Sequence, residues 1–396
     1  MKTRCDNGLG RMGVILLVAA SMSIGVAEAD QDDTRSMIVF GDSLADSGNL
    51  PSLTYLIPTS DPQAPATQGP TVPPPTRYDR GRFSNGRVFS EDVASRLGTY
   101  LVPSNTYNGE GGANFAHGGA STGALALVPG GFPVPGILGQ VAQYLSQRLS
   151  GQAPIPANQG TIHLIVGGAN DYILGTLYEF GLLQRPPQTP PELLPSAYPG
   201  DVVDNLEAAI RQLYAGAGAR IFVIPNLPDL GVIPLCAPFD SLKLCDSLTM
   251  LAAEHNGLLD QTLAELESAL PGATFVQVDF YRLFDRVLKN PNKFGFSDTR
   301  GHPAPGPASG CLFEQPFLAA NCTKLASFES DQLFWDEEHP TWKAHRLMGS
   351  KVWESLVERG IVDDRCQGGR PCGGPPPGLR NRAADGPGRW RRGNGD

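Results

Sequence analysis

Four apolar runs of strand length recur along the chain, and segments with helical spacing of apolar residues fall between them. The runs are residues 36–40, 162–166, 221–224 and 274–278. Helical periodicity fits residues 88–97, 137–149, 202–215 and 248–270, and a last helix is predicted over 341–357. Strands that alternate with helices favour a parallel sheet covered by helices on both faces. The sequence therefore predicts an α/β fold with a central parallel sheet.

Proline-rich segments interrupt this alternation at residues 58–75, 153–159, 186–199 and 301–308. The strand–helix alternation resumes after the first three segments, and the last predicted helix follows the fourth. We therefore interpret these segments as excursions from one sheet and expect one domain rather than two. The 41% of hydrophobic residues is enough for a sizeable core.

The N-terminus resembles a signal peptide for export. Lys2, Arg4 and Arg11 precede an apolar run over residues 12–26, and Ala27-Glu28-Ala29 supplies small residues at a cleavage site after Ala29. An uncleaved membrane anchor is the alternative, although the run is short for a membrane span. No later segment approaches the apolar length of a membrane helix. The expected organisation is a signal peptide at 1–29, a folded domain at 30–365 and a disordered Gly/Pro/Arg-rich tail at 366–396.

Charge and cysteine content narrow the function classes. The net charge of -9 disfavours nucleic-acid binding, because neutralising phosphates requires a basic face. In an exported chain, an even number of cysteines after the signal favours disulfides, and nearest-neighbour pairing is one of about fifteen connectivities. Metal binding is the weaker alternative, since the spacing does not match a structural zinc site. The disulfide candidates are Cys236, Cys245, Cys311, Cys322, Cys366 and Cys372.

A serine follows the first predicted strand directly, in Gly41-Asp42-Ser43. We expect a helix to begin after it, so that the Ser43 N–H points outward at a helix N-terminus and suits a developing negative charge. The position lies at the carboxyl edge of the sheet, where α/β proteins place ligands. Alone, the triplet is weak evidence, because most Gly-Asp-Ser triplets are merely turns.

Three further segments carry candidate chemistry. The glycines of residues 111–119 allow a close approach of backbone to ligand, although they also fit a flexible loop. Asn170 follows a predicted strand and can donate a side-chain N–H to an oxyanion, although Asn and Asp there also make turns. Asp336-x-x-His339 puts both side chains on one side of a turn, so Asp336 can orient His339 while His339 accepts a proton. A metal pair is the alternative for Asp336 and His339.

Taken together, these segments resemble the four blocks of the GDSL, or SGNH, hydrolase family. Its Ser, Gly, Asn and His correspond here to Ser43, Gly118, Asn170 and His339, in the family's order and over roughly residues 36–357. Residues 81–87, Gly-Arg-Phe-Ser-Asn-Gly-Arg, also match the extracellular lipase/esterase branch. The resemblance implies a three-layer α/β/α sandwich of flavodoxin-like type and acyl transfer without a metal or cofactor.

The resemblance also implies roles for the residues. Ser43 would be the nucleophile, His339 the general base and acid, and Asp336 its orienter. The oxyanion would be held by the backbone N–H groups of Ser43 and Gly118 and by the Asn170 amide, with Gly119 as the alternative glycine.

The expected partner is a small-molecule or lipid ester. Residues 123–139 and 178–198 are candidate walls of an acyl groove, with packed surface loops as the equal alternative. An acyltransferase or phospholipase using the same acyl-enzyme, a polysaccharide acetylesterase and a non-catalytic surface-binding protein are the other functions considered.

Overall fold

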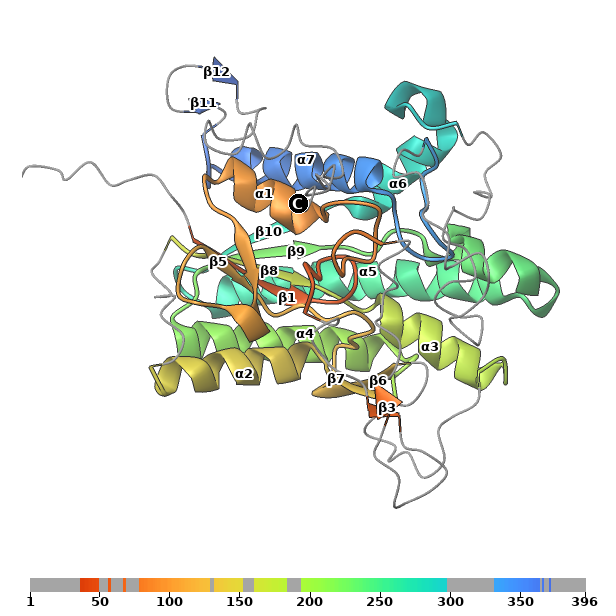
Figure 1. Cartoon of the computed structure of the whole chain (residues 1–396), viewed down its shortest axis with the longest axis horizontal. Helices are drawn as coiled ribbons and strands as arrows, with labels where there is room; N and C mark the ends of the chain where they lie inside the picture. The colour runs from red at the N-terminus through yellow and green to blue at the C-terminus, as the bar shows by residue number, and fades with distance from the viewer. Residues whose placement is uncertain are drawn as a thin grey trace, which may run out of the picture. The chain divides into compact units, whose positions relative to one another are not determined.

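The computed structural model, shown in Figure 1, describes six stretches of the chain and the backbone of four short strands. The stretches are residues 36–49, 78–128, 132–151, 160–183, 194–297 and 331–363. The short strands pair as β2 (Leu56–Ile57) with β3 (Thr67–Gln68) and β11 (Arg365–Cys366) with β12 (Arg370–Pro371). The expected signal peptide, most of the expected tail and the side chains of Cys311, Cys322, Cys366 and Cys372 lie outside the described residues.

A six-stranded sheet in the order β10-β9-β8-β1-β5-β4 forms the centre of the described fold, and all of its strand pairs are parallel. Its strands are β1 (Met37–Gly41), β4 (Leu101–Pro103), β5 (Gly112–Asn114), β8 (Ile162–Val166), β9 (Ile221–Pro225) and β10 (Thr274–Val278). Every residue of β1 and β8 is buried, as expected for parallel strands covered on both faces. Val39 lies opposite Asn114 on one side and Leu164 on the other.

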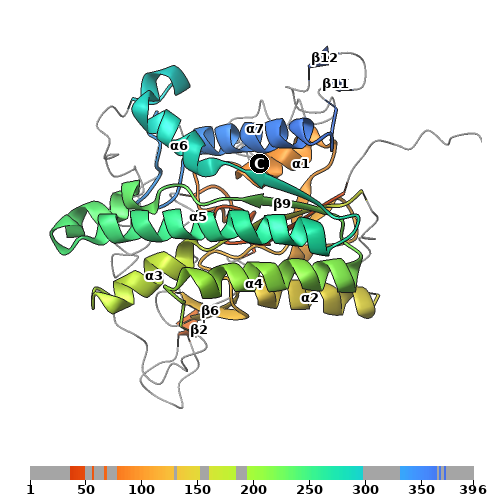
Figure 2. The same cartoon turned by 180° about the vertical axis from the view of Figure 1, so that it is seen from behind.

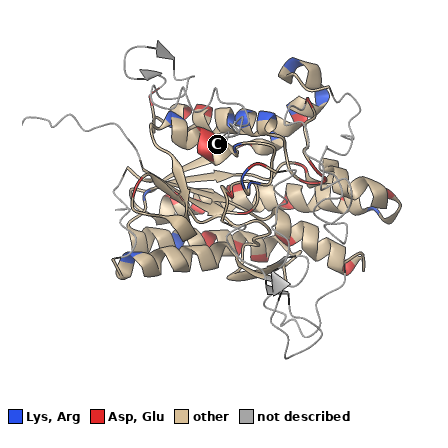
Figure 3. Ribbon diagram, in the orientation of Figure 1, with Lys and Arg blue, Asp and Glu red and all other residues tan. Residues whose placement is uncertain are grey.

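Helices cover both faces of the sheet, and alternate residues of β1 contact different layers. Met37 and Val39 pack in one core with residues of α1 (Phe89–Arg96), α6 (Phe280–Lys289) and α7 (Trp342–Glu358). Ile38 and Phe40 pack in the other core with α2 (Ile137–Leu149), α4 (Pro199–Gln212) and the C-terminal half of α5 (Leu244–Ala269). Figure 2 shows the two helical layers from behind, and Figure 3 shows that charged residues lie mainly on helices and loops. The predicted three-layer α/β/α sandwich is confirmed.

Several elements match the predicted bounds closely. Strands β8 and β10 and helix α2 have the predicted bounds, and α7 begins one residue after the predicted start. The predicted helix 202–215 is observed as α4, which continues as a π-helical segment at Leu213–Ala217. Short 3₁₀ segments complete the described helices, at Ser104–Thr106, Leu230–Val232 (η5), Pro234–Leu242 (η6) and Pro291–Phe294.

The prediction that a helix begins after Ser43 is wrong. The chain makes a single turn in which the N–H groups of Ala45 and Asp46 donate to the Asp42 carbonyl. The Asp42 carboxylate then accepts the Leu44 N–H, and the Asp46 carboxylate accepts the N–H groups of Gly48 and Asn49. These side chains replace the backbone acceptors that a helix would use, which is how Asp and Asn oppose helix formation.

Other elements were not predicted. Strand β5 is only Gly112-Ala113-Asn114, and a Cβ on Gly112 would lie 2.4 Å from the Met37 carbonyl oxygen. Helix α3 (Ala169–Glu179) begins in the Gly-Gly-Ala-Asn-Asp segment, for which a turn was the alternative interpretation. Strand β4, a hairpin of β6 (Leu125–Val128) and β7 (Phe132–Pro135), and helix α6 were also not predicted.

A disulfide joins Cys236 in η6 to Cys245 in the first turn of α5, with the two Cα atoms 5.2 Å apart. This confirms one of the three nearest-neighbour pairs. Among the described residues, no helix has both the length and the apolar character needed to cross a membrane.

A buried glutamine holds the end of β1. The Gln140 side chain accepts the Gly41 N–H at 2.8 Å and donates to the Gly41 carbonyl at 2.8 Å. The strand end also lies close to β8, because a Cβ on Gly41 would lie 2.6 Å from the Val166 carbonyl oxygen. Gln140 therefore satisfies the last backbone groups of β1, directly before Ser43.

Replacing Gln140 should destabilise the fold. Gln140→Ala leaves the buried Gly41 N–H without its acceptor, so we expect the free energy of unfolding in urea to fall by about 1–3 kcal/mol. Gln143→Ala, on the same helix, is the matched control because the same side-chain type there is only half-buried. Equal stability of the two variants would show that the Gly41 contacts contribute nothing.

Candidate active site

The candidate residues gather at the carboxyl edge of three neighbouring strands. Ser43 follows β1, the glycines Gly118 and Gly119 follow β5, and Asn170 lies in the first turn of α3 after β8. The chain passes from β1 to one side of the sheet and later returns to β8 on the other side. The carboxyl edge beside such a switch point is the usual ligand site of an open α/β sheet.

Ser43, His339 and Asp336 form a continuous hydrogen-bonded chain. His339 Nε2 lies 2.8 Å from Ser43 Oγ, and His339 Nδ1 lies 2.8 Å from Asp336 Oδ2. All three side chains are buried, and the Asp336 side chain has no exposed surface. This is the geometry in which an imidazole can accept a serine proton while a carboxylate fixes its tautomer.

The loop before α7 brings Asp336 and His339 together. A bridge pairs Phe334 with Pro340, and the Trp335 N–H donates to the His339 carbonyl. Inside this loop, the Asp336 Oδ1 atom accepts the N–H groups of Glu338 and His339 at 2.8 and 2.7 Å. The expected proximity of the two side chains therefore follows from a tight turn that the aspartate itself stabilises.

The two groups shift each other's pKa. Burial alone raises the pKa of Asp336, but the charge of His339 and the hydrogen bonds from the turn hold it below its usual value. Burial alone lowers the pKa of His339, but Asp336, followed by Glu338 and Asp42, raises it above its usual value. The pair is thus arranged to stabilise an imidazolium beside a carboxylate.

Tyr78 is a member of the site that the sequence did not indicate. Its hydroxyl donates to Asp336 Oδ2 at 2.7 Å across 258 residues of sequence. Nothing in the sequence around Tyr78 marks it, because a buried tyrosine is more often a packing residue.

The Gly-Arg-Phe-Ser-Asn-Gly-Arg segment supports the histidine loop. Ser84 Oγ donates to the Pro340 carbonyl, and Asn85 Oδ1 accepts the Trp342 N–H. The Phe83 ring packs against the His339 ring with centroids 5.1 Å apart. The segment is therefore structural, and it explains why residues 81–87 accompany a C-terminal histidine block.

Two of the three expected oxyanion donors remain available. No hydrogen bond from the Ser43 N–H is seen within the described residues, and Asn170 uses one amide hydrogen to donate to the Ala120 carbonyl at 3.0 Å. The Gly118 N–H, however, donates to Asp46 Oδ2 at 2.9 Å. This contact conflicts with the expected role of Gly118. Gly119, next to it, has a φ of 77°, a left-handed backbone that favours glycine.

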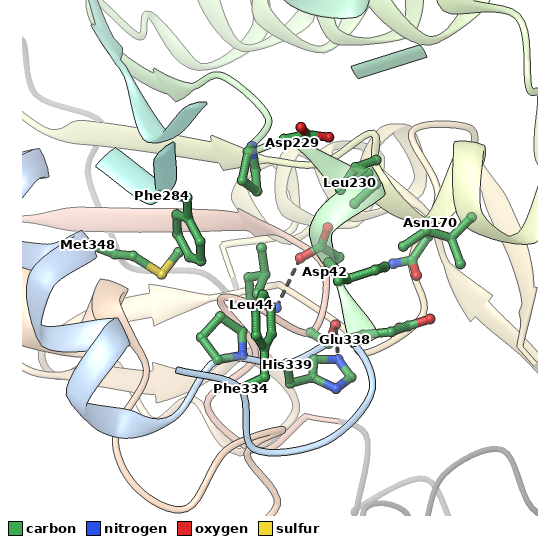
Figure 4. Close-up of a pocket in the computed structure, with 16 residues that line it drawn as sticks. Asp42, Leu44, Asn170, Asp229, Leu230, Phe284, Phe334, Glu338, His339 and Met348 are labelled. Atoms are coloured by element: carbon green, nitrogen blue, oxygen red, sulfur yellow. Dashed lines mark hydrogen bonds between the residues drawn. The ribbon is translucent and has the colours of Figure 1, made fainter. Parts of the chain in front are cut away.

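A pocket beside Ser43 leads away from these donors, as shown in Figure 4. Its apolar lining comes from Leu44, Ala169, Ile173, Pro228, Leu230, Ile233, Phe284, Phe334, Pro340 and Met348. The two segments expected to form the walls, 123–139 and 178–198, contribute none of the described lining residues. The described part of the first segment fits the alternative of a packed surface loop, because its hairpin packs on α2. Residues of η5, α6 and α7 line the pocket.

Carboxyl groups make up much of the polar lining. Burial raises the pKa of Asp42 to about 6 and that of Glu338 to about 8. Asp171, just outside, accepts the Thr122 N–H and hydroxyl, and burial raises its pKa to about 7. No lysine or arginine is among the described residues that line the pocket.

Comparison with known proteins identifies the family. The model of the GDSL-like lipase/acylhydrolase family matches residues 37–352. The chain belongs to this family.

Curated relatives agree with that assignment. One GDSL esterase/lipase of Arabidopsis thaliana is 30% identical over 369 residues, covering 86% of this chain and 92% of the relative. A second is 27% identical over 358 residues, covering 85% and 94%. An acetylxylan esterase from Geobacillus stearothermophilus is similar in structure with a TM-score of 0.39 at 12% identity, covering 84% of this chain and 100% of that one. The family model and the curated relatives together show that this chain is an ester-bond hydrolase.

Activity should fall at low pH as His339 becomes protonated. Because the pKa of His339 is raised, we expect the acid limb of kcat/KM to lie above the ordinary histidine pKa of about 6.5. Asp336→Asn removes the charge that raises this pKa, so the limb should move to lower pH while kcat falls by about 10⁴-fold. Asp363→Asn, at an exposed position, is the control. An unchanged acid limb in Asp336→Asn would contradict the coupling.

Loss of the Tyr78 hydroxyl should weaken catalysis without weakening substrate binding. Tyr78→Phe removes a hydrogen bond to a buried carboxylate, so we expect kcat to fall about tenfold or more. KM should stay unchanged, because Tyr78 is not among the residues that line the pocket. Steady-state kinetics measures both, and Tyr144→Phe, a buried tyrosine in the core on the other face of the sheet, is the control. A rise in KM at constant kcat would refute this role.

Proposed function

We propose that this chain is a secreted carboxylic ester hydrolase that works through an acyl-enzyme on Ser43. The observation that carries the proposal is the 2.8 Å contact between His339 Nε2 and Ser43 Oγ, with Asp336 on the other ring nitrogen. A serine hydroxyl is a weak nucleophile until a base takes its proton, and this contact provides the base.

The reaction has two halves, and in each half His339 acts first as the base and then as the acid. Ser43 Oγ attacks the ester carbonyl while its proton passes to His339 Nε2, and the C–O bond to the alcohol breaks as His339 returns the proton to the leaving oxygen. Water then attacks the acyl-enzyme, losing its proton to His339, and the acid leaves as Ser43 regains a proton. Asp336 holds the imidazole ring in place and stabilises its charged form throughout.

Two backbone N–H groups and one amide are the proposed donors to the oxyanion. Ser43 N–H and Asn170 Nδ2 keep their expected roles. Because Gly118 N–H donates to Asp46, the proposal assigns the third donor to Gly119 N–H instead. Each such donor contributes about 10²–10³ in kcat in a preorganised site.

Export is the second part of the proposal. The basic and apolar pattern of residues 1–29 supports a cleaved signal peptide. The disulfide between Cys236 and Cys245 supports folding in an oxidising compartment, where such bonds persist.

Covalent labelling tests the nucleophile directly. A fluorophosphonate should label the mature protein at Ser43, and p-nitrophenyl acetate should be cleaved. Ser43→Ala should abolish both while the circular dichroism spectrum stays unchanged. Ser146→Ala, on the exposed surface of α2, should leave both intact.

Two other results would change the conclusion. Labelling of another residue, or ester cleavage retained by Ser43→Ala, would refute the mechanism. An acyltransferase would instead label at Ser43 but transfer most of the acyl group to an added alcohol, so the ratio of transfer to hydrolysis separates these two activities.

A further inference from the structure

The pocket beside Ser43 is apolar at the end away from the oxyanion donors. Phe284 of α6 and Met348 of α7 lie there, and Figure 4 shows both on the opposite side of the pocket from Asn170. Phe334 and Leu44 line the pocket between them and the catalytic residues. Phe284, Phe334 and Met348 are each at most 4% exposed. The walls at this end are therefore set by side chains packed into the core and unable to move freely.

Such walls favour a hydrocarbon over a sugar. A sugar inserted here would leave its hydroxyl groups without partners, and each unpaired polar group in an apolar space costs about 1–3 kcal/mol. An alkyl chain has no such requirement, and burying each methylene contributes about 0.8 kcal/mol.

The pocket is also small. Its volume is ≈ 40 Å³, whereas an apolar cavity that binds benzene has about 150 Å³. The space beyond Ser43 therefore suits an acyl chain of about two to four carbons and not a longer one.

The polar groups of the lining disfavour an acidic acyl group. Asp42, Asp229 and Glu338 line the pocket, and none of its described lining residues is lysine or arginine. A second carboxylate on the substrate would be desolvated near these groups, with no lysine or arginine in the described lining to pair with.

We propose that this pocket is the acyl site, that it accepts short uncharged acyl chains, and that Met348 and Phe284 set the length limit. The inference rests on the proposed role of Ser43, because the acyl group is bonded to that residue. It assigns the enzyme to esters of short fatty acids and places the alcohol on the solvent side of Ser43.

Enlarging the far wall tests the length limit. With p-nitrophenyl acetate, butyrate and octanoate, the wild-type protein should show the highest kcat/KM for acetate or butyrate. Met348→Ala should raise the octanoate-to-acetate ratio of kcat/KM by about tenfold or more, the scale of discrimination that one methylene supplies in an apolar pocket. Met250→Ala is the matched control, because Met250 is 71% exposed on α5. An unchanged ratio in a folded Met348→Ala would overturn the proposal.

A measurement on the wild-type protein does not depend on how the variant folds. Alkylboronic acids of two to eight carbons bind a serine nucleophile with the alkyl group in the acyl position, and we expect inhibition to be strongest at two to four carbons. Inhibition that strengthens steadily to eight carbons would overturn the length limit.

Further controls separate the alternatives. An acetate series with alcohols of increasing length should give the same kcat/KM ratio for wild type and Met348→Ala, and a changed ratio would place the alcohol in the pocket.

A monosuccinate ester should be cleaved more slowly than the butyrate ester, and equal rates would overturn the selection against a charged acyl group. Absence of fluorophosphonate labelling at Ser43 would instead refute the proposed nucleophile, so the two failures are distinguishable.

Discussion

The buried carboxylate of Asp336 is the constraint on which the site depends. An ionised carboxylate without solvent must be satisfied by donors, and unpaired it would cost several kcal/mol. Asp336 receives hydrogen bonds from the Glu338 and His339 N–H groups, from the His339 ring and from the Tyr78 hydroxyl. These donors come from two segments far apart in sequence. Satisfying one charge thus closes the C-terminal turn, fixes the imidazole and ties the loop to the N-terminal half of the sheet.

Asp46 has a similar function on the other side of Ser43. It is fully buried and accepts the N–H groups of Gly48, Asn49 and Gly118. The first two contacts stop the chain after Ser43 from forming a helix. The third ties the glycine loop after β5 to the serine turn, which places Gly119 in the left-handed conformation next to it. The Asp46 carboxylate therefore stabilises the turn that holds Ser43. It also accepts the Gly118 N–H, which the family resemblance had implied as an oxyanion donor.

Sequence reasoning succeeded where one local signal decided the structure. The apolar run of β8 and the periodicity of α2 predicted these elements with their observed bounds, because burial on both faces or on one helical face leaves a repeating pattern. It failed for β5, whose three residues pair between β1 and β4 through backbone contacts that small side chains permit. The Asp336–His339 pair was proposed because its spacing is local, whereas Ser43 was singled out only because four ordered segments together resemble the family. Tyr78 was not, because its partner lies 258 residues away and only the fold brings them together.

The residues that line the pocket were not predicted, for a related reason. An apolar, glycine-rich segment close to the oxyanion residues in sequence was expected to border the substrate, but nearness along the chain does not determine which side of the sheet a segment reaches. The pocket is lined by the turn after β1, α3, η5 with its flanking residues, α6, the loop before α7, and α7 itself, and each supplies only one to three of the apolar side chains. Most of these residues also pack in the core that contains Met37 and Val39, so packing already accounts for their apolar character. The residues proposed to select the acyl group therefore look like ordinary core residues in the sequence. Their effect on the acyl group can be inferred only from the space that the folded structure leaves beside Ser43.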